Sequence, residues 1–171
     1  MRFLSFRFLF ACDIGNAYLN APCLEKIWFQ GCIECGQSVR DRVMRLTRAL
    51  YGLKSSSPSL RKMFKDHIET ALEFKSSRVD PDMYWRRNTK QDGSAYYELL
   101  LVYVDDVLAV SHDPEAIMKM IGERFEIKND EYGPPTRYLG GDIEKFHLPD
   151  GTSAWSMTSC SYVKAAVETV K

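Results

Sequence analysis

Two adjacent carboxylates, Asp105 and Asp106, lie inside an otherwise apolar run at residues 99–110. Burying a carboxylate charge near a protein core is unfavourable unless the charge is paired or binds a metal ion. A polar hairpin turn is the simplest alternative, because aspartate is a common turn residue. Side chains alternate along a strand, but at a tight turn two neighbouring carboxylates can both approach one point in front of a sheet. The pair is therefore either a plain turn or part of an acidic site.

A third carboxylate, Asp13, lies near the end of another apolar segment, residues 8–14. If the two segments are neighbouring strands, the three carboxylates converge. Hard oxygen donors with no His or Cys beside the acidic pair favour Mg²⁺ over zinc. Two Mg²⁺ ions about 4 Å apart are a common arrangement for in-line phosphoryl transfer. The pattern therefore indicates a candidate site for that chemistry.

The elements that must position these residues are predicted from apolar periodicity and turn residues. Strands are expected at 8–14, 27–33, 43–46, 83–87, 96–104, 138–146 and 153–157, with a buried hairpin at 99–110. The strand at 43–46 is expected to pair with the strand at 27–33. Helices are expected as a short stub at 15–20, from Pro58 until Asp80-Pro81 breaks the pattern, at 113–125 and from about Ser161. The helix at 113–125 is expected to have Asp113 as its N-cap and Pro114 at its first position. Several strands follow one another without a helix between them, so parallel crossovers cannot join them all. We expect an α+β fold with an antiparallel sheet packed on helices.

Composition is that of one globular domain. The chain has 171 residues, of which 45% are hydrophobic and 27% charged, which argues against disorder and a small disulfide scaffold. The formal net charge of zero is the sum of two halves of the chain that carry opposite charges. Residues 1–78 hold 13 Lys/Arg and 7 Asp/Glu, a balance of +6, and residues 79–171 hold 10 and 16, a balance of −6.

The most strongly basic window is residues 40–65, in which Asp41 is the one acidic residue. Its basic residues are Arg40, Arg42, Arg45, Arg48, Lys54, Arg61, Lys62 and Lys65. Such a run is either a solvated face or a surface for a polyanion such as a nucleic acid.

The five cysteines are Cys12, Cys23, Cys32, Cys35 and Cys160, an odd count without the spacing of a secreted disulfide framework. Cys32 and Cys35 form a C-x-x-C pair, but a structural zinc site needs two more ligands, and the nearest in sequence are Cys12 and Cys23. We expect reduced intracellular thiols, with a small zinc site as the alternative. The apolar residues 1–10 resemble a signal peptide superficially, but Arg7 divides them and the stretch is too short to span a membrane. We expect no reliable targeting signal and no membrane partner.

Four motifs occur in order along the chain: residues 13–18 (DIGNAY), 49–54 (ALYGLK), 103–106 (YVDD), and 138–140 (YLG) followed by Asp142-Ile143. In sequence, order and approximate spacing they resemble the motifs of reverse transcriptases from copia-type long-terminal-repeat retrotransposons. The resemblance runs from about Phe10 to Thr158. It implies a right-hand polymerase palm and RNA-directed DNA polymerase activity, with nucleotidyl transfer to a primer 3′-hydroxyl.

The resemblance also implies roles for single residues. Asp13 and Asp105 would bind two Mg²⁺ ions, for which Mn²⁺ can substitute, and Asp106 would assist as the third carboxylate. The implied nucleotide site consists of the backbone at Ile14 and Gly15, of Tyr18 as a steric gate against a 2′-hydroxyl, and of Tyr51, Gly52 and Lys54. Ordinary core packing is the alternative for Tyr18 and Tyr51. The implied primer and template contacts are Tyr103, Leu139, Gly140, Arg45 and Arg48.

The family further implies partners and a location. The partners are an RNA/DNA template-primer, deoxynucleoside triphosphates and the rest of a polyprotein, which includes fingers, thumb, ribonuclease H and integrase. The location is intracellular, in a cytoplasmic virus-like particle of an element that integrates its DNA.

The chain also departs from the family pattern. Residues 55–60 (SSSPSL) stand where relatives usually have a Gln, an Arg and an aromatic residue. We interpret residues 1–9 as an unassigned leader, 10–158 as the palm core and 159–171 as the start of the next helix, so that 1–171 is a partial domain with the fingers largely absent and the thumb and ribonuclease H absent. The alternative is a catalytically inactive remnant that at most binds nucleic acid through residues 40–65.

Overall fold

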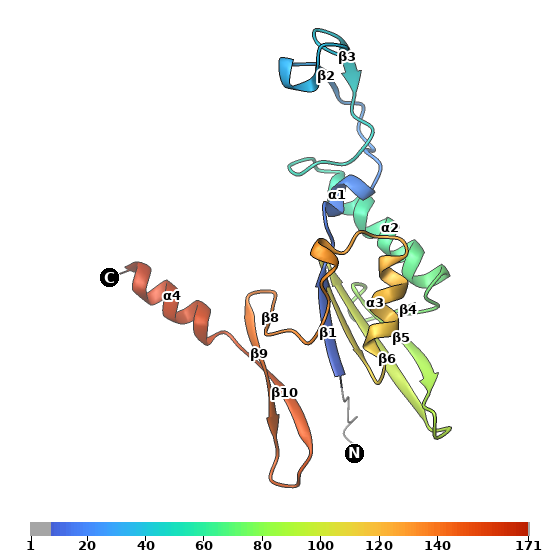
Figure 1. Ribbon diagram of the computed structural model, residues 1–171, viewed down its shortest axis with the longest axis vertical. Helices are drawn as coiled ribbons and strands as arrows, with labels where there is room; N and C mark the ends of the chain where they lie inside the picture. Colours follow the sequence, from blue (N-terminus) through green and yellow to red (C-terminus); the bar gives the residue numbers. More distant parts are fainter. Residues whose placement is uncertain (1–7, 171) are drawn as a thin grey trace. The chain divides into compact units, whose positions relative to one another are not determined.

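The computed structural model describes residues 8–170, which divide into two compact units (Figure 1). The described part of the first unit comprises residues 8–15 and 68–170, and the second unit comprises residues 16–67. Most of the predicted leader, residues 1–7, lies outside the described residues. Within residues 8–170, no helix has both the length and the apolar character that a membrane crossing requires.

The first unit is built on a five-stranded sheet in the order β1-β7-β6-β5-β4, in which every neighbouring pair is antiparallel. The strands are β1 (Phe8–Asp13), β4 (Lys75–Ser76), β5 (Met83–Thr89), β6 (Ala95–Tyr103) and β7 (Asp106–Ser111). The predicted mixed fold with antiparallel sheets is therefore confirmed, as is the hairpin over residues 99–110.

Helix α3 (Pro114–Gly122) packs against β1 and β7. The Asp113 carboxylate accepts a hydrogen bond from the backbone N–H of Ala116 at 3.2 Å, and Pro occupies the first helical turn, as the sequence predicts. The apolar side chains Ile117, Met118 and Ile121 are buried. The helix ends at Gly122, three residues before the predicted end at Phe125, although the Phe125 N–H still donates to the Ile121 carbonyl.

A second sheet of the first unit has the order β10-β9-β8 and comprises β8 (Arg137–Tyr138), β9 (Gly141–His147) and β10 (Ser153–Thr158). Helix α4 (Cys160–Val170) contacts β9, and the short helix η2 (Lys128–Asp130) precedes the sheet. The prediction of one strand over 138–146 is wrong. Leu139 and Gly140 have φ values of 47° and 79° and form a two-residue turn between β8 and β9. Positive φ at both central residues is the geometry that closes such a hairpin.

The second unit contains α1 (Ala17–Asn20), the antiparallel pair β2 (Trp28–Gln30) and β3 (Val43–Arg45), the single-turn helix η1 (Ile33–Cys35) and most of α2 (Ser56–Thr70). The predicted pairing of the strands near 27–33 and 43–46 is confirmed, although both are shorter than predicted.

Helix α2 begins two residues before Pro58, which lies in the first helical turn, where a missing N–H is tolerated. It ends at Thr70, ten residues earlier than the predicted break at Asp80. Beyond it, Glu73 has a φ of 59°, and the Phe74 N–H donates to the Ile68 carbonyl. Local left-handed backbone, and not the proline, therefore follows the helix end.

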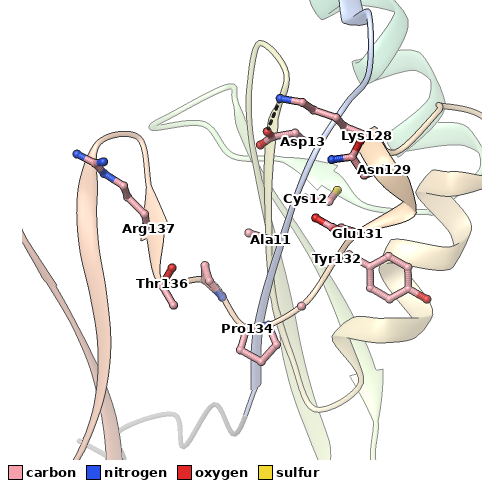
Figure 2. A pocket seen from close by; sticks show the side chains of 12 residues that line it. Ala11, Cys12, Asp13, Lys128, Asn129, Glu131, Tyr132, Pro134, Thr136 and Arg137 are labelled. Carbon is pink, nitrogen blue, oxygen red and sulfur yellow. Dashed lines mark ion pairs between the residues drawn. The ribbon is translucent and has the colours of Figure 1, made fainter.

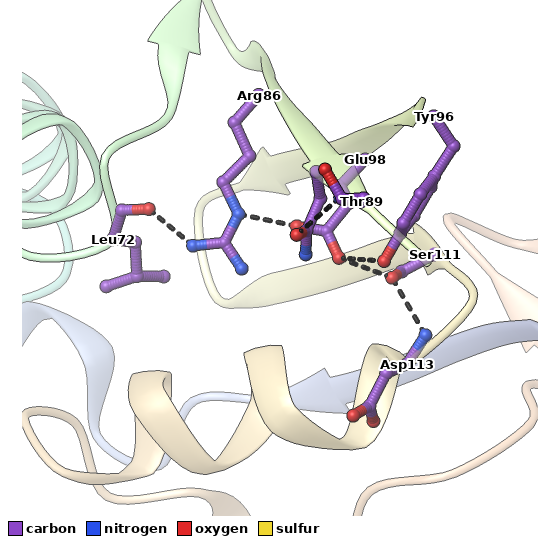
Figure 3. A network of polar contacts seen from close by, with 8 residues as sticks. Leu72, Arg86, Thr89, Tyr96, Glu98, Ser111 and Asp113 are labelled. Carbon is purple, nitrogen blue, oxygen red and sulfur yellow. Dashed lines mark hydrogen bonds and ion pairs between the residues drawn. The ribbon is translucent and has the colours of Figure 1, made fainter. Parts of the chain in front are cut away.

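The core of the first unit contains one buried acid, Glu98 of β6, which is 1% exposed (Figure 3). Its carboxylate accepts hydrogen bonds from Arg86 Nε at 2.5 Å, from Ser111 Oγ at 2.6 Å and from the Tyr96 hydroxyl at 3.0 Å. Arg86 also donates to the Leu72 carbonyl at 2.6 Å. The network connects β5, β6 and β7 with the segment that follows α2.

Candidate active site

The predicted acidic site is built on the register of β1 and β7. Asp13, the last residue of β1, lies directly opposite Asp106, the first residue of β7. Asp106 also pairs in register with Tyr103, the last residue of β6. Residues opposite one another in an antiparallel pair project to the same face of the sheet. The two carboxylate-bearing strands are therefore neighbours, which is the condition under which the sequence predicts that their carboxylates converge.

A tight turn at Val104-Asp105 joins β6 to β7 beside this pair. Val104 has a φ of 57°, which is an unfavourable backbone conformation for a β-branched residue. The Asp105 carbonyl accepts a hydrogen bond from the Ile14 N–H at 2.8 Å, which ties the turn to the end of β1. Strained backbone of this kind persists where the surrounding structure holds it, and it is common at functional sites.

Burial and the charges around the pair Asp13–Asp106 shift the pKa of Asp106. Burial, together with hydrogen bonding to Asp13 and the negative charges of Asp13 and Asp105, raises the pKa of Asp106 to about 6. Lys128 opposes this shift, and its Nζ atom lies 3.6 Å from Asp13 Oδ2. The Asp13 side chain is 54% exposed, so solvent reaches the pair.

Two neighbouring groups also respond to the acidic charge. Burial and the charges of Asp13 and Asp106 raise the pKa of the Cys12 thiol to about 12. Burial and the charge of Asp106 raise the pKa of the Tyr138 hydroxyl. Tyr138 packs with Leu9 and Leu108 of the five-stranded sheet, so a buried residue of the second sheet lies within range of the Asp106 charge.

A cavity of about 470 Å³ opens beside Asp13 (Figure 2). Its walls are the end of β1 (residues 11–13) and the segment from Lys128 to Arg137. Figure 2 shows the Lys128 side chain reaching toward Asp13 from one side and Arg137 lying on the other. The cavity thus combines carboxylate oxygens with two cationic side chains, which suits a ligand that carries phosphate groups.

We tested whether these residues fit the predicted metal ions. The pair Asp13–Asp106 supplies hard oxygen donors, which Mg²⁺ prefers. The negative charge of the pair is only partly balanced by Lys128. Within residues 8–170, however, no group of three or more His, Cys, Asp or Glu side chains is placed to hold a metal ion. The structure therefore pairs Asp13 with Asp106 and places Asp105 at the adjoining turn, without gathering all three carboxylates into one cluster.

The backbone N–H groups expected near a triphosphate are engaged within the chain. The Ile14 N–H donates to Asp105, and the Gly15 N–H donates to the Glu126 carbonyl, each at 2.8 Å. A Cβ atom added to Gly15 would lie 3.5 Å from the Glu126 carbonyl oxygen, so the glycine brings the chain close to that segment without being required by it.

Four predicted nucleotide-site residues lie in the second unit. The Tyr18 side chain is buried, its hydroxyl lies 2.8 Å from Ser57 Oγ, and its ring meets the Tyr51 ring edge to face at 4.6 Å. Tyr51 is 67% exposed, Gly52 has a φ of 90°, and Lys54 is exposed. Tyr18 and Tyr51 therefore contact one another, and Tyr18 also packs within its own unit.

The five predicted primer and template residues are Tyr103, Leu139, Gly140, Arg45 and Arg48. In the first unit, Tyr103 is exposed at the end of β6, and Leu139 and Gly140 form the β8–β9 turn. In the second unit, Arg45 is exposed at the end of β3, and Arg48 donates to the Asn20 carbonyl at 3.0 Å. The structure does not bring these residues together at one point within either unit.

Sequence reasoning missed Lys128 and Arg137, which line the cavity. Lys128 begins the short helix η2 and Arg137 begins the two-residue strand β8, and the residues between them lack apolar periodicity, so no local pattern indicated that this segment returns to β1. An isolated bridge between Ala11 and Gly133 makes this contact. Tyr138 was assigned to the fourth motif, but its burial against Leu9 was not predicted, because it depends on a contact between two sheets.

A sequence model of the family described as "Reverse transcriptase (RNA-dependent DNA polymerase)" matches residues 5–170. The chain is 28% identical over 137 residues, 77% of its length, to the "Retrovirus-related Pol polyprotein from transposon TNT 1-94" of Nicotiana tabacum. It is 28% identical over 148 residues and 26% identical over 145 residues, each 81% of its length, to the Pol polyproteins from transposons RE1 and RE2 of Arabidopsis thaliana. These matches cover 10%, 9% and 9% of the relatives, so the chain spans about a tenth of their length.

Proposed function

Because the chain belongs to the reverse transcriptase (RNA-dependent DNA polymerase) family, we propose that it supplies the palm of such an enzyme and its carboxylates for nucleotidyl transfer. The predicted membership among copia-type retrotransposon reverse transcriptases is confirmed by the family match and the transposon relatives. The observation that carries the proposal is the cross-strand pair Asp13–Asp106 beside the turn at Asp105. The substrates proposed are deoxynucleoside triphosphates and an RNA template with a primer.

In this proposal Asp13 and Asp105 hold two Mg²⁺ ions, or Mn²⁺ in their place, and Asp106 assists. The chemistry that these ions supply when bound is a lower pKa of the primer 3′-hydroxyl and stabilisation of the charge on the transferred phosphate. The raised pKa of Asp106 supports the assignment, because burial and, after it, the hydrogen bond and charge of Asp13 and the charge of Asp105 disfavour its ionised form, and a bound cation would favour that form.

The chain's own backbone contacts determine where the three carboxylates lie. The β1–β7 ladder sets the separation of Asp13 from Asp106, and the bond from Ile14 to Asp105 holds the turn against β1. The buried Tyr138 side chain packs with Leu9 and Leu108, and burial and the charge of Asp106 raise the pKa of its hydroxyl. Lys128 partly balances Asp13 and, at the rim of the cavity, is placed to bind phosphate oxygens.

We assign the sugar-selecting role to Tyr18. The contacts with Ser57 and Tyr51 restrict rotation of its ring, and a ring held in place excludes a 2′-hydroxyl by steric contact. Gly52 and Lys54 complete the nucleotide side, and Tyr103, Leu139, Gly140, Arg45 and Arg48 contact the primer and template. The remaining partners are the other regions of a Pol polyprotein, since the relatives carry that name.

The test is extension of a DNA primer on an RNA template by the chain joined to the adjoining polyprotein regions. Extension should require Mg²⁺, and Asp105→Asn should reduce its rate on the order of 10³-fold, because several kcal/mol of charge stabilisation is lost. Asp92→Asn is the matched control, since Asp92 is an exposed turn residue of the same sheet. Undiminished extension by Asp105→Asn would overturn the assignment of the site.

A second function, nucleic-acid binding without catalysis, is favoured by a separate observation. All eight cationic residues of the window 40–65 are exposed. They are Arg40, Arg42, Arg45, Arg48, Lys54, Arg61, Lys62 and Lys65. Several phosphate contacts predict that RNA affinity falls steeply as salt rises. Binding that is absent or insensitive to salt would exclude this function.

A further inference from the structure

A pair of thiols lies on the loop between β2 and β3. Cys32 precedes the single-turn helix η1 and Cys35 ends it, and their Sγ atoms are 3.4 Å apart. Both side chains are exposed. A 3₁₀ turn brings residues i and i+3 onto the same side, so the C-x-x-C spacing and the local backbone both place the thiols together.

Backbone hydrogen bonds join the two ends of this loop, at Gly31 and at Asp41 and Arg42. The Gly31 N–H donates to the Arg42 carbonyl at 2.9 Å, and the Asp41 N–H donates to the Gly31 carbonyl at 3.0 Å. A Cβ atom at Gly31 would clash with the Val39 carbonyl oxygen, so only glycine permits this approach. The thiol pair is therefore carried on a loop whose ends are fixed by backbone contacts.

The pair lacks the further ligands of a structural zinc site. Within residues 8–170, no group of three or more His, Cys, Asp or Glu side chains could hold a metal ion, so the described residues do not add a third ligand to the thiol pair. Cys23 is buried and its thiol faces the Glu25 carbonyl at 3.4 Å, while Cys12 is buried in the other unit. The chemistry left to two adjacent exposed thiols is that of a dithiol.

We propose that Cys32 and Cys35 form a redox-active dithiol site that reacts with small-molecule disulfides of the glutathione type. One cysteine thiolate attacks the disulfide, forms a mixed disulfide and releases one small thiol. The second cysteine then attacks the mixed disulfide, forms the Cys32–Cys35 bond and releases the second small thiol. The two cysteines lose two electrons and two protons in total, and the small disulfide gains both.

Glu34, between the two cysteines, biases this chemistry. Hydrogen bonding to Glu34 and then to Cys35 raises the pKa of the Cys32 thiol. Less thiolate at Cys32 means less stabilisation of the reduced form, which favours the disulfide at equilibrium. The same effect slows attack by Cys32, so closure should quicken as the pH rises.

The experiment treats the full chain with glutathione disulfide and measures intact mass, followed by peptide mapping. The expected product has lost two hydrogen atoms and links Cys32 to Cys35. Cys35→Ser should instead retain a glutathione adduct at Cys32, with on the order of 100-fold more mixed disulfide than the unchanged chain, because the intramolecular second attack is lost. Cys160→Ser is the matched control, since it removes an exposed cysteine on α4 and should leave the closure unchanged.

A trivalent arsenical, phenylarsine oxide, gives a second measurement that does not depend on oxidation. One equivalent should bridge Cys32 and Cys35, and Cys32→Ser or Cys35→Ser should abolish the bridge. Stable separate glutathione adducts on both cysteines, or failure of the arsenical to bridge them, would overturn the dithiol site. Stoichiometric zinc in protein purified without chelator would overturn it in favour of a metal site.

Discussion

Glu98 of β6 and Asp106 of β7 are acids on neighbouring strands of one sheet, yet their pKa values move in opposite directions. Burial disfavours the ionised form of both. For Glu98, hydrogen bonds from Ser111 and Arg86 and the Arg86 charge outweigh burial and lower the pKa. For Asp106, the nearest acidic partner is Asp13, and the pKa rises to about 6.

The difference shows that partners, and not the depth of burial, decide the role of a carboxylate in this sheet. Glu98 is the more deeply buried of the two, at 1% exposure, but its charge is balanced and three donors bind it. It acts as a structural anion. Asp106 faces a second carboxylate, and the charge of Lys128, which pairs with Asp13, opposes the rise of its pKa. Such a site is less stable by itself and is suited to bind a cation.

The largest expected effect comes from breaking the balanced site. Glu98→Gln keeps the shape of the side chain but leaves the Arg86 guanidinium without its counter-charge. We expect the free energy of unfolding to fall by about 3 kcal/mol, the range found when one partner of a buried ion pair is removed. Urea unfolding monitored by circular dichroism measures it.

The matched control is Glu115→Gln, which breaks the ion pair with Lys119 on the surface of α3. Both side chains of that pair are more than half exposed, so the loss should be at most about 0.5 kcal/mol. Equal losses for the two variants would show that the Glu98 network contributes no more than a surface pair.

The unbalanced site should respond with the opposite sign. In the presence of a chelator at pH 7.5, Asp106→Asn should increase the free energy of unfolding by about 1–2 kcal/mol, because a destabilising charge is removed from a partly exposed site. Urea unfolding again measures it. A loss of stability would mean that the Asp106 charge is balanced in the folded chain.

The pH dependence of unfolding separates the two acids further. The folded pKa of Asp106 lies above its unfolded value, so its stabilising proton is lost and stability falls as the pH rises from about 4 to about 6. The folded pKa of Glu98 lies below its unfolded value, so its contribution is present above the unfolded pKa and is lost on acidification. Asp106→Asn should flatten the first change alone, and Glu98→Gln the second alone.

A third acid in the same unit gives an intermediate test. Asp113 is exposed and accepts one hydrogen bond from the first turn of α3. Asp113→Ala should lower the free energy of unfolding by about 1 kcal/mol, as for other N-cap residues, and Asp113→Asn by only a few tenths. Thermal and urea unfolding measure both. A loss as large as that of Glu98→Gln would show that the cap supports the buried network through Ser111.

The sequence predicted features that depend on neighbouring residues. The hairpin at 99–110, the cap at Asp113 and the C-x-x-C pair at Cys32 all follow from local spacing. Glu98 was not identified as buried, because its partners Arg86 and Ser111 lie on other strands and no local pattern reveals their register. The same reason explains why the segment around Lys128 was missed, while the pairing of Asp13 with Asp106 was predicted only on the condition that their strands are neighbours.

The sequence also failed to predict where some turns lie and where some helices end. Leu139 was expected within a strand over 138–146, but its left-handed conformation is set by the hairpin that it closes with Gly140. Helix α2 ends at Thr70 although apolar residues continue to Leu72 with helical spacing. Periodicity shows which face is buried, but the end of an element depends on backbone contacts such as the one between Phe74 and Ile68.

The smallest expected effect concerns Lys128. Its charge lowers the pKa of Asp106 and its ammonium pairs with Asp13, but the side chain is 61% exposed, so solvent screens both interactions. Lys128→Ala should move the titration midpoint of Asp106 to a higher pH and change the free energy of unfolding by less than about 0.5 kcal/mol. Carboxyl-carbon NMR titration in chelator measures the midpoint. Lys119→Ala, which removes an exposed lysine paired with Glu115, should leave the midpoint where it is. A midpoint that falls in Lys128→Ala, or that moves equally in both variants, would show that Lys128 does not act on the carboxylate pair and that Asp106 has another cation as its partner.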